Sequence, residues 1–135
     1  MAGILVDSNV LLDVMTSDSA WYEWSSAKLR ELSEHEGLVI NPIVYAEISI
    51  GFRTIEELEY ALLGTLMERR PIPWEAAFLA GKCFQQYRRR GGIRHSPLPD
   101  FFIGAHAAVE GMALLTRDAV RYRTYFPRLR LLAPE

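Results

Sequence analysis

The chain has 135 residues, half of them hydrophobic, and a formal net charge of −2. A chain of this length is typical of a single domain, and such a domain buries roughly two-thirds of the surface of its unfolded chain. The single cysteine, Cys83, excludes an internal disulfide, and the small net charge argues against non-specific nucleic-acid binding by the whole surface. We expect one domain that spans residues 1–135.

The charged residues are distributed unevenly along the chain. Residues 1–81 contain 5 basic and 13 acidic side chains, whereas residues 82–135 contain 10 basic and 4 acidic ones, and nine of those ten are arginines. The basic half permits phosphate binding in one region, although a solvated arginine surface explains the same pattern equally well.

The sequence contains no signal for a membrane. No stretch approaches the roughly 18 apolar residues that a membrane span requires. The first residues lack the basic start of a signal peptide, and Asp7 interrupts their apolar run. A lone cysteine is also compatible with a reducing compartment. We therefore expect a cytoplasmic protein that does not associate with membranes.

The first half of the chain alternates short apolar runs with helical patterns. The apolar runs at residues 4–6 and 38–40 predict buried strands, and helix-starting residues follow each run. Amphipathic spacing predicts helices over residues 17–33, 43–50 and 54–66. The last of these begins with Thr54 and Glu57 in the spacing of a capping box.

The second half continues the alternation. Residues 70–73 read as an extended connector, and a long helix over 74–90 ends at two glycines. Pro99 suits the first position of the next helix, because its missing N–H would be unpaired there in any case. The remaining elements are strands over 113–116 and 129–132 and a short helix over 119–125. Strands that alternate with helices predict an α/β fold with a parallel sheet covered on both faces.

Four acidic residues occupy positions that such a fold can bring together. Asp7 follows the first strand and Asp118 follows the strand over 113–116, while Asp100 opens the helix before that strand. Glu47 lies in the helix after the second strand, where spacing alone leaves its direction open. Taken singly, the aspartates could be helix-start residues and the glutamate could be exposed. Because ligands bind beyond the carboxyl ends of parallel strands, we expect the four carboxylates to meet there.

Clustered carboxylates repel one another unless a cation lies between them. Oxygen ligands suit Mg²⁺ or Mn²⁺, whereas the sequence has no cluster of cysteine and histidine at zinc spacing. A divalent ion in such a site can activate water and stabilise the transition state of phosphodiester hydrolysis. Two other carboxylate sites are excluded. Asn9 replaces the second aspartate of haloacid-dehalogenase-like phosphatases, and the paired early acids and late lysine of receiver domains are absent.

The sequence resembles PIN-domain ribonucleases, in particular the VapC-type toxins of type II toxin–antitoxin systems. The similar stretches are residues 6–13, 41–47, 98–107, 114–118 and 121–127. The resemblance implies a three-layer α/β/α sandwich with a short central parallel sheet. It also implies Mg²⁺- or Mn²⁺-dependent endonucleolytic cleavage of RNA, a cognate antitoxin and a homodimer.

The resemblance also assigns roles to individual residues. Asp7 and Asp100 correspond to the principal metal ligands of the family. Glu47 and Asp118 would complete the site directly or through water. Because all four acids are present, the resemblance implies an active enzyme.

Several further positions carry weaker expectations. Asn9 and Thr116 occupy places where the family often has a supporting amide or hydroxyl. The residues expected to contact RNA are Arg94, His95 and Arg117. The alternative to the enzyme is a catalytically silent module of the same fold that binds RNA or a protein partner.

Overall fold

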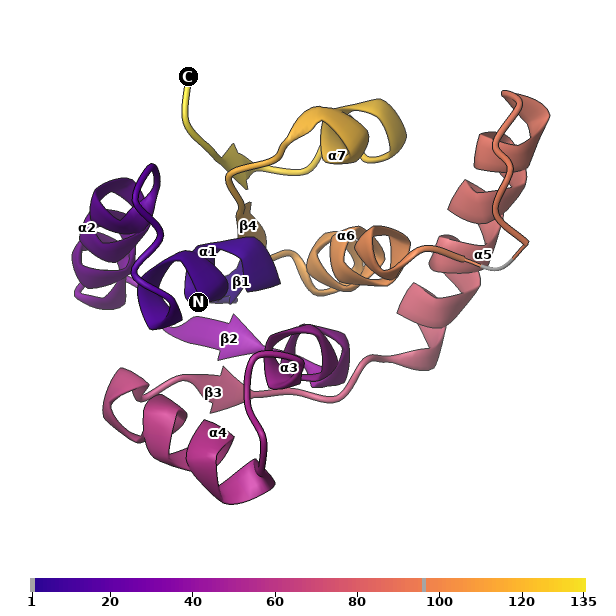
Figure 1. Ribbon diagram of the computed structural model, residues 1–135. Coiled ribbons are helices and arrows are strands. Elements are labelled where there is room, and N and C mark those ends of the chain that lie inside the picture. The colour runs from indigo at the N-terminus through magenta and orange to yellow at the C-terminus, as the bar shows by residue number, and fades with distance from the viewer. Residues whose placement is uncertain (1, 96) are drawn as a thin grey trace.

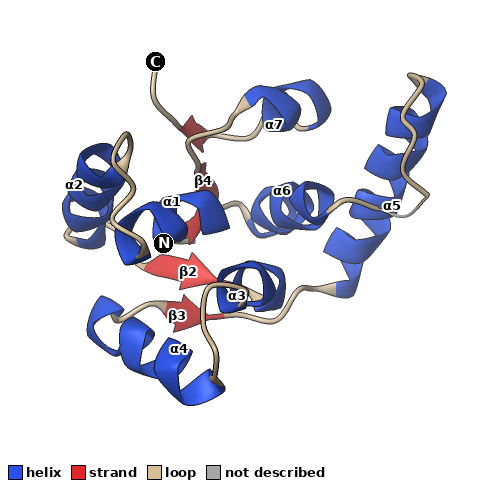
Figure 2. Cartoon of the chain, viewed as in Figure 1, coloured by secondary structure: helices blue, strands red, loops and turns tan. Residues whose placement is uncertain are grey.

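The computed structural model describes residues 2–95 and 97–135 of the chain (Figures 1 and 2). The strands are β1 (Ile4–Val6), β2 (Leu38–Ile40), β3 (Glu68–Arg69), β4 (Ala113–Leu115) and β5 (Leu131–Leu132). The helices are α1 (Ser8–Met15), α2 (Tyr22–Ser33), α3 (Pro42–Ser49), α4 (Ile55–Leu62), α5 (Trp74–Arg89), α6 (Pro99–Glu110) and α7 (Val120–Tyr125). A short 3-10 helix, η1 (Leu63–Thr65), follows α4.

The strands form one parallel sheet in the order β3-β2-β1-β4-β5. From β1 the chain adds β2 and then β3 on one side. It returns through α5 and α6 to place β4 on the other side of β1. The direction of strand addition therefore reverses between β1 and β4. In open parallel sheets this reversal leaves a crevice at the carboxyl ends of the two strands, where ligands bind.

Helices cover the sheet on both sides. In Figure 1, α1 and α2 lie on one side of β1 and β4, and α5 and α6 lie on the other. The residues of β1, β2 and β4 are all buried, as expected for strands covered on both faces. The predicted α/β/α sandwich with a short parallel sheet is thus confirmed.

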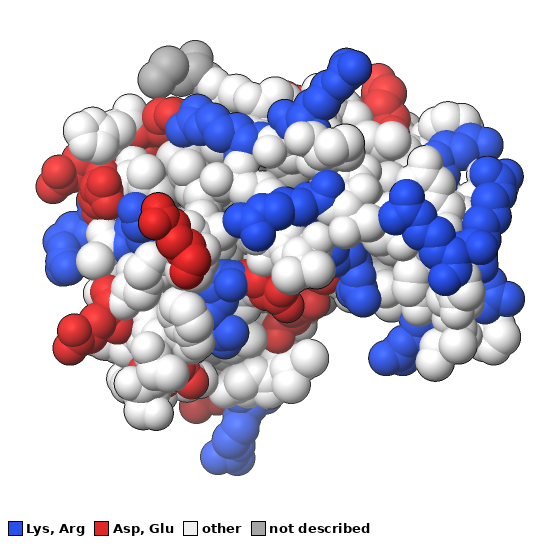
Figure 3. Space-filling model, turned by 90° about the horizontal axis from the view of Figure 1, so that it is seen from above, with Lys and Arg blue, Asp and Glu red and all other residues white. Residues whose placement is uncertain are grey.

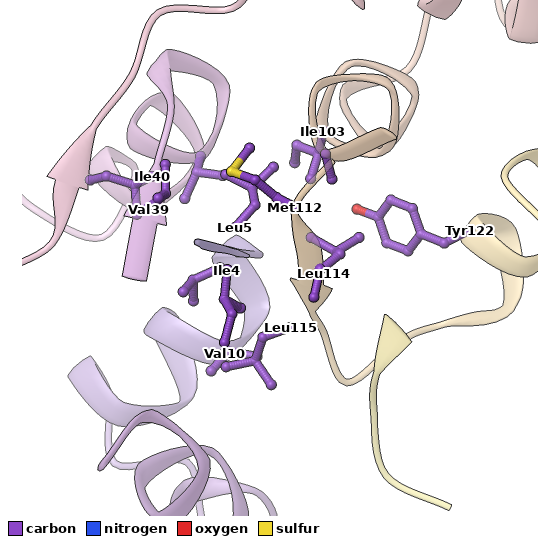
Figure 4. Close-up of a cluster of buried hydrophobic side chains, with 14 of the residues drawn as sticks. Ile4, Leu5, Val10, Val39, Ile40, Ile103, Met112, Leu114, Leu115 and Tyr122 are labelled. Atoms are coloured by element: carbon purple, nitrogen blue, oxygen red, sulfur yellow. The ribbon is translucent and has the colours of Figure 1, made fainter. Parts of the chain in front are cut away.

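The core extends from the sheet to α6 and α7. In Figure 4 the ring of Tyr122 points from α7 toward Leu114 of β4 and Ile103 of α6. Gly104 of α6 allows the ring of Phe126 to approach closely, because a Cβ at this glycine would lie only 2.4 Å from that ring. The start of α6 and the whole of α7 are therefore fixed close to β4.

Two helix boundaries differ from the prediction by more than one residue. Helix α2 begins at Tyr22 rather than Ser17, since Ser17 has a left-handed backbone (φ 52°) and the carboxylate of Asp18 accepts the N–H groups of Ala20 and Trp21. Helix α4 ends at Leu62, whereas the predicted helix extends to Leu66, which has a left-handed backbone and is 91% exposed. Both differences arise from local backbone conformations that hydrophobic spacing does not report.

The structure also bears on the predicted absence of a membrane span. Across residues 2–95 and 97–135, none of the helices has both the length and the apolar character needed to cross a bilayer.

Candidate active site

Asp7 lies at the carboxyl end of β1, where the strand passes into α1. Its backbone is extended, and its Oδ1 accepts the N–H of Ser8 at 2.8 Å as the N-cap of the helix. Its own N–H donates to the carbonyl of Leu115 at 2.9 Å, which completes the pairing of Val6 with Leu115 at the end of the two strands. The predicted capping role is present, and the same geometry points the second carboxylate oxygen into the crevice.

The second oxygen of Asp7, Oδ2, is surrounded by hydrogen-bond donors. The hydroxyls of Thr116 and Tyr122 each donate to it at 2.9 Å, and the amide of Asn9 lies 3.5 Å away. Asp7 is only 4% exposed. Burial raises the pKa of Asp7 to about 6; the two hydroxyls oppose this change and the charge of Asp100 adds to it.

Asp100 approaches Asp7 from the first turn of α6. Its Oδ1 lies 3.3 Å from the hydroxyl of Tyr122, and its Oδ2 accepts from Arg121 at 3.3 Å. The hydroxyl of Tyr122 therefore lies between the carboxylates of Asp7, which follows β1, and Asp100, which lies in α6. Burial raises the pKa of Asp100, whereas the charge of Arg121 lowers it. The pKa of Tyr122 is itself raised, first by burial and then by Asp7, so the hydroxyl keeps its proton.

Glu47 faces the same crevice from α3. Its Oε1 accepts from the hydroxyl of Ser8 at 2.8 Å, which gives the direction that the sequence left open. Burial raises the pKa of Glu47, the bond from Ser8 lowers it, and the charge of Asp100 raises it further. Glu47 and Asp100 are therefore close enough to interact electrostatically.

Thr116 and Asn9 connect the ends of β1 and β4. The hydroxyl of Thr116 donates to Asp7 and accepts from the amide of Asn9 at 3.2 Å and from the N–H of Asp118 at 3.2 Å. The side-chain oxygen of Asn9 accepts the N–H of Arg117 at 3.3 Å. These bonds fix the loop after β4. Asp118 itself is exposed, and its charge contributes to the raised pKa of Asp100.

The residues expected to contact RNA occupy different environments. Arg117 makes two bonds to the buried carboxylate of Asp13, at 2.7 and 3.0 Å, and its guanidinium lies over the ring of Trp21. It ties the loop after β4 to α1 and α2. Arg94 and His95 are exposed in the loop after α5, so their side chains are accessible to a ligand.

Tyr122, Arg121 and Ser8 contact the acids but were not identified from the sequence. Arg121 and Tyr122 lie in the helix predicted over residues 119–125, shortly after the predicted site residue Asp118. That position in the chain was the available signal. It does not give the direction of either side chain, which depends on how α7 packs against α6.

The donor set suits a hard cation that retains water. In the part of the chain that the structure describes, no three acidic, histidine or cysteine side chains stand close enough together to hold a metal ion. Mg²⁺, however, usually keeps several waters and needs only one or two carboxylates. Asp7 and Asp100, which share one hydroxyl, fit that requirement.

Comparison with known proteins identifies the family. The family model described as the PIN domain matches residues 4–127. The chain belongs to the PIN-domain family. No significant match is found among curated proteins.

Solved structures with the same PIN fold include three complexes. VapBC2 from Rickettsia felis, bound to a promoter DNA fragment, has a TM-score of 0.74 at 20% identity over 98% of each chain. VapBC-1 from nontypeable Haemophilus influenzae has a TM-score of 0.71 at 18% identity over 96% of each chain. FitAcB from Neisseria gonorrhoeae has a TM-score of 0.70 at 18% identity over 96% of each chain. At this identity, the comparisons establish the fold.

Proposed function

We propose that this PIN-domain protein is a metal-dependent RNA endonuclease and the toxic member of a toxin–antitoxin pair. The main support is the placement of Tyr122, whose hydroxyl lies within 2.9 Å of Asp7 and 3.3 Å of Asp100. This contact brings the two acids together at the strand-order reversal, where α/β proteins bind ligands.

The proposed cofactor is Mg²⁺ or Mn²⁺. Asp7 and Asp100 would hold the ion, and Glu47 and Asp118 would complete the site through water, since no third acid of the described residues stands close enough to join them directly. Burial and neighbouring charge raise the pKa of Asp7, Asp100 and Glu47, so a cation would relieve an existing electrostatic conflict. When bound, the ion supplies an activated water and stabilises charge on the phosphodiester.

Side chains of the protein would position the metal ligand, the attacking water and the RNA. Thr116 and Tyr122 hold the carboxylate of Asp7 in one orientation. Glu47, which is half-buried and held by Ser8, can orient a water or accept its proton. Arg121 lies beside Asp100 and can exchange that carboxylate for a phosphate of the RNA.

The proposed partner is a cognate antitoxin. The structural neighbours are complexes named VapBC or FitAcB, and one more is described as a toxin–antitoxin complex from Klebsiella pneumoniae. Helix α4 and η1 expose large apolar side chains that a partner could cover, namely Ile55, Tyr60, Leu63 and Leu66. A homodimer is the second proposed assembly.

Cleavage of RNA by the purified protein tests the nuclease. We expect cleavage with Mg²⁺ or Mn²⁺, none after chelation, and none with Asp7→Ala or Asp100→Ala. Glu34→Ala, which removes an exposed acid at the end of α2, should cleave normally. Cleavage that survives both aspartate substitutions would contradict the assignment. Sequencing of the cut ends after induced expression would identify the RNA.

One observation favours the silent binding module as a second possibility. Arg121 and Tyr122 already contact Asp100, so part of the acidic charge is balanced without an ion. A titration with Mn²⁺ discriminates between the two functions. Failure to bind at millimolar Mn²⁺ would favour the binding module, whereas saturable binding would favour the enzyme.

A further inference from the structure

A hollow of about 370 Å³ opens beside the acidic site, between α5, α6 and α7. Asp100 and Asp118 line it on the side of the site, Tyr87 and Tyr125 contribute aromatic rings, and Arg121 and Thr124 come from α7. Ligand sites in proteins commonly enclose about 300–1,000 Å³, so this hollow is large enough for a small group. It is continuous with the carboxylate that would hold the metal.

The two tyrosine rings are fixed by the core. Both pack edge-on against Phe101, with ring centroids 5.7 Å away for Tyr87 and 5.1 Å away for Tyr125. Phe101 is completely buried. Gly92 also packs against Tyr87, since a Cβ at that glycine would lie 2.3 Å from the ring. Both rings therefore lie at defined positions before any ligand binds.

Arginines surround the same rings. The guanidinium of Arg90 lies 5.3 Å from the centre of the Tyr125 ring, and the backbone N–H of Arg94 donates to the hydroxyl of Tyr87. The Arg88 side chain bonds the carbonyl of Arg94 at 2.8 Å, which holds the basic loop against the end of α5. Figure 3 shows blue side chains gathered over the end of the molecule where α5 lies.

We propose that this hollow is a subsite for one unpaired nucleotide of the RNA, next to the phosphodiester at Asp7 and Asp100. The base lies against Tyr125 and the edge of Tyr87, whose face is stacked on Phe84, and Arg121 with Arg90 holds its phosphate. The inference rests on the proposed function, because it places RNA at the acids. Proteins recognise single-stranded RNA by stacking splayed bases on aromatic and arginine side chains.

RNA fits these groups better than an acidic peptide does. A peptide carboxylate would satisfy the arginines, but it would lie against Asp100 and Asp118 and would bring no flat ring to the tyrosines. An unpaired nucleotide supplies both a phosphate and a planar base.

Thr124→Glu tests the subsite without disturbing the core. Thr124 is exposed, and its hydroxyl bonds the carbonyl of Val120 one turn earlier. Thr16 is the matched control, because it is also exposed and bonds the carbonyl of Leu12 in the same way at the end of α1. Both Thr→Glu variants add the same charge, but only Thr124→Glu obstructs the hollow.

Binding is measured with a short fluorescent single-stranded RNA of mixed sequence, with chelator present so that the RNA stays intact. We expect Thr124→Glu to bind about 10-fold or more weakly than Thr16→Glu, as for the loss of one stacked base. Thermal unfolding of both variants reports their folding. Equal affinities in two folded variants would overturn the proposal.

Photocrosslinking supplies a second readout that does not depend on a substitution. RNA carrying photoreactive thiouridine should label peptides that contain Tyr87 or Tyr125, and a competing acidic peptide should not reduce the labelling. Labelling confined to other elements, or displacement by the peptide, would contradict the subsite.

Different experimental results would contradict the proposed subsite and the proposed nuclease activity. If wild-type protein cuts RNA and Thr124→Glu cuts and binds like Thr16→Glu, the subsite is wrong and the nuclease stands. If wild-type protein never cuts RNA but its binding is lost in Thr124→Glu, the subsite stands and the nuclease is wrong.

Discussion

Asp7 is an ionisable side chain held almost entirely away from water. Its carboxylate accepts from the N–H of Ser8 and from the hydroxyls of Thr116 and Tyr122. These donors lower the cost of burying the charge, yet burial still dominates and the pKa stays raised. Residues selected for stability alone are seldom buried acids, and groups with perturbed pKa values concentrate in functional sites.

The raised pKa of Asp7 predicts a pH dependence of stability in the metal-free protein. Its pKa rises from 3.8 to about 6 on folding, so the folded state binds the proton more tightly than the unfolded state does. The protonated form therefore contributes stability below pH 4, and this contribution of about 3 kcal/mol is lost as the pH rises through 6. Urea unfolding of the wild type and Asp7→Asn, from pH 4 to 7, measures the difference. Parallel stability curves for the two proteins would contradict the prediction.

Tyr122 should position the two aspartates for a metal ion. Removing its hydroxyl in Tyr122→Phe leaves the ring in place but frees Asp7 and Asp100 to move apart. Loss of a group that orients metal ligands typically costs about 10- to 100-fold in metal affinity, and we expect that loss for Mn²⁺. Calorimetric titration with Mn²⁺ gives the affinity.

Tyr45→Phe is the matched control for Tyr122→Phe. The hydroxyl of Tyr45 in α3 also donates to a carboxylate at 2.7 Å, but the acceptor is Glu59 of α4 rather than one of the site acids. Tyr45→Phe loses a bond to one carboxylate, whereas Tyr122→Phe loses the bonds to Asp7 and Asp100, and only Tyr122→Phe should lose metal affinity. Equal Mn²⁺ affinities in the two variants would show that Tyr122 has only a structural role.

The positions of the four acids could be predicted from the sequence, whereas several of the residues that hydrogen-bond to them or fix the neighbouring loop could not. Asp7, Glu47, Asp100 and Asp118 follow from strand ends and family motifs, although their catalytic roles stay predictions. The partner of Arg117, in contrast, is Asp13, which lies 104 positions earlier in the chain. Hydrogen bonds over such separations depend on how α1, α2 and the loop after β4 pack, and no local pattern records that packing.

At the scale of whole elements, the apolar runs predicted most of the sheet. Residues 4–6 and 38–40 form β1 and β2 as predicted, because a fully buried strand needs an unbroken apolar run. The strands at the edges of the sheet were harder to predict from the sequence. β3 consists of Glu68 and Arg69, which are exposed, so its sequence has no apolar signal and only pairing with β2 makes it a strand.

Two helical glycines should respond to alanine in opposite directions. A Cβ at Gly104 in α6 would collide with the ring of Phe126, whereas a Cβ at Gly81 in α5 would meet no atom within 4 Å. Gly104→Ala should destabilise the protein by about 1–3 kcal/mol through overpacking. Gly81→Ala should stabilise it by about 0.5–1 kcal/mol, because alanine restricts the unfolded chain. Denaturant unfolding compares them, and a shift of the same sign in both variants would contradict this account.

At the scale of the whole molecule, the fold brings the two charge classes together. The basic second half of the sequence supplies the end of α5 and α7, and these elements flank acids that come from both halves. The charge asymmetry was visible in the sequence. Its placement beside the site was not, because it depends on how α5 and α6 return the chain to β4.

A divalent ion should stabilise the whole fold. An ion that binds only the folded state at about 100 times its dissociation constant adds about 2.7 kcal/mol to the free energy of unfolding. We therefore expect Mg²⁺ or Mn²⁺ to raise the melting temperature of the wild type and to leave that of Asp7→Ala almost unchanged. Thermal unfolding at increasing metal concentration tests this. An equal shift in both proteins would place the ion elsewhere.

The pairing of β1 with β4 has a consequence for how the sheet assembles. Ile4, Leu5 and Val6 lie opposite Ala113, Leu114 and Leu115, and all six side chains are buried and apolar. Sliding one strand by a residue would replace each apolar neighbour with another apolar side chain. Apolar contacts alone therefore discriminate poorly between the possible registers of β1 and β4. The side-chain bond from Thr116 to Asp7 needs these two residues side by side and therefore forms in a single alignment. The polar pair of Thr116 and Asp7 thus selects the correct register of β1 and β4. A relative that lost these two side chains would need other specific contacts to keep the strands in register.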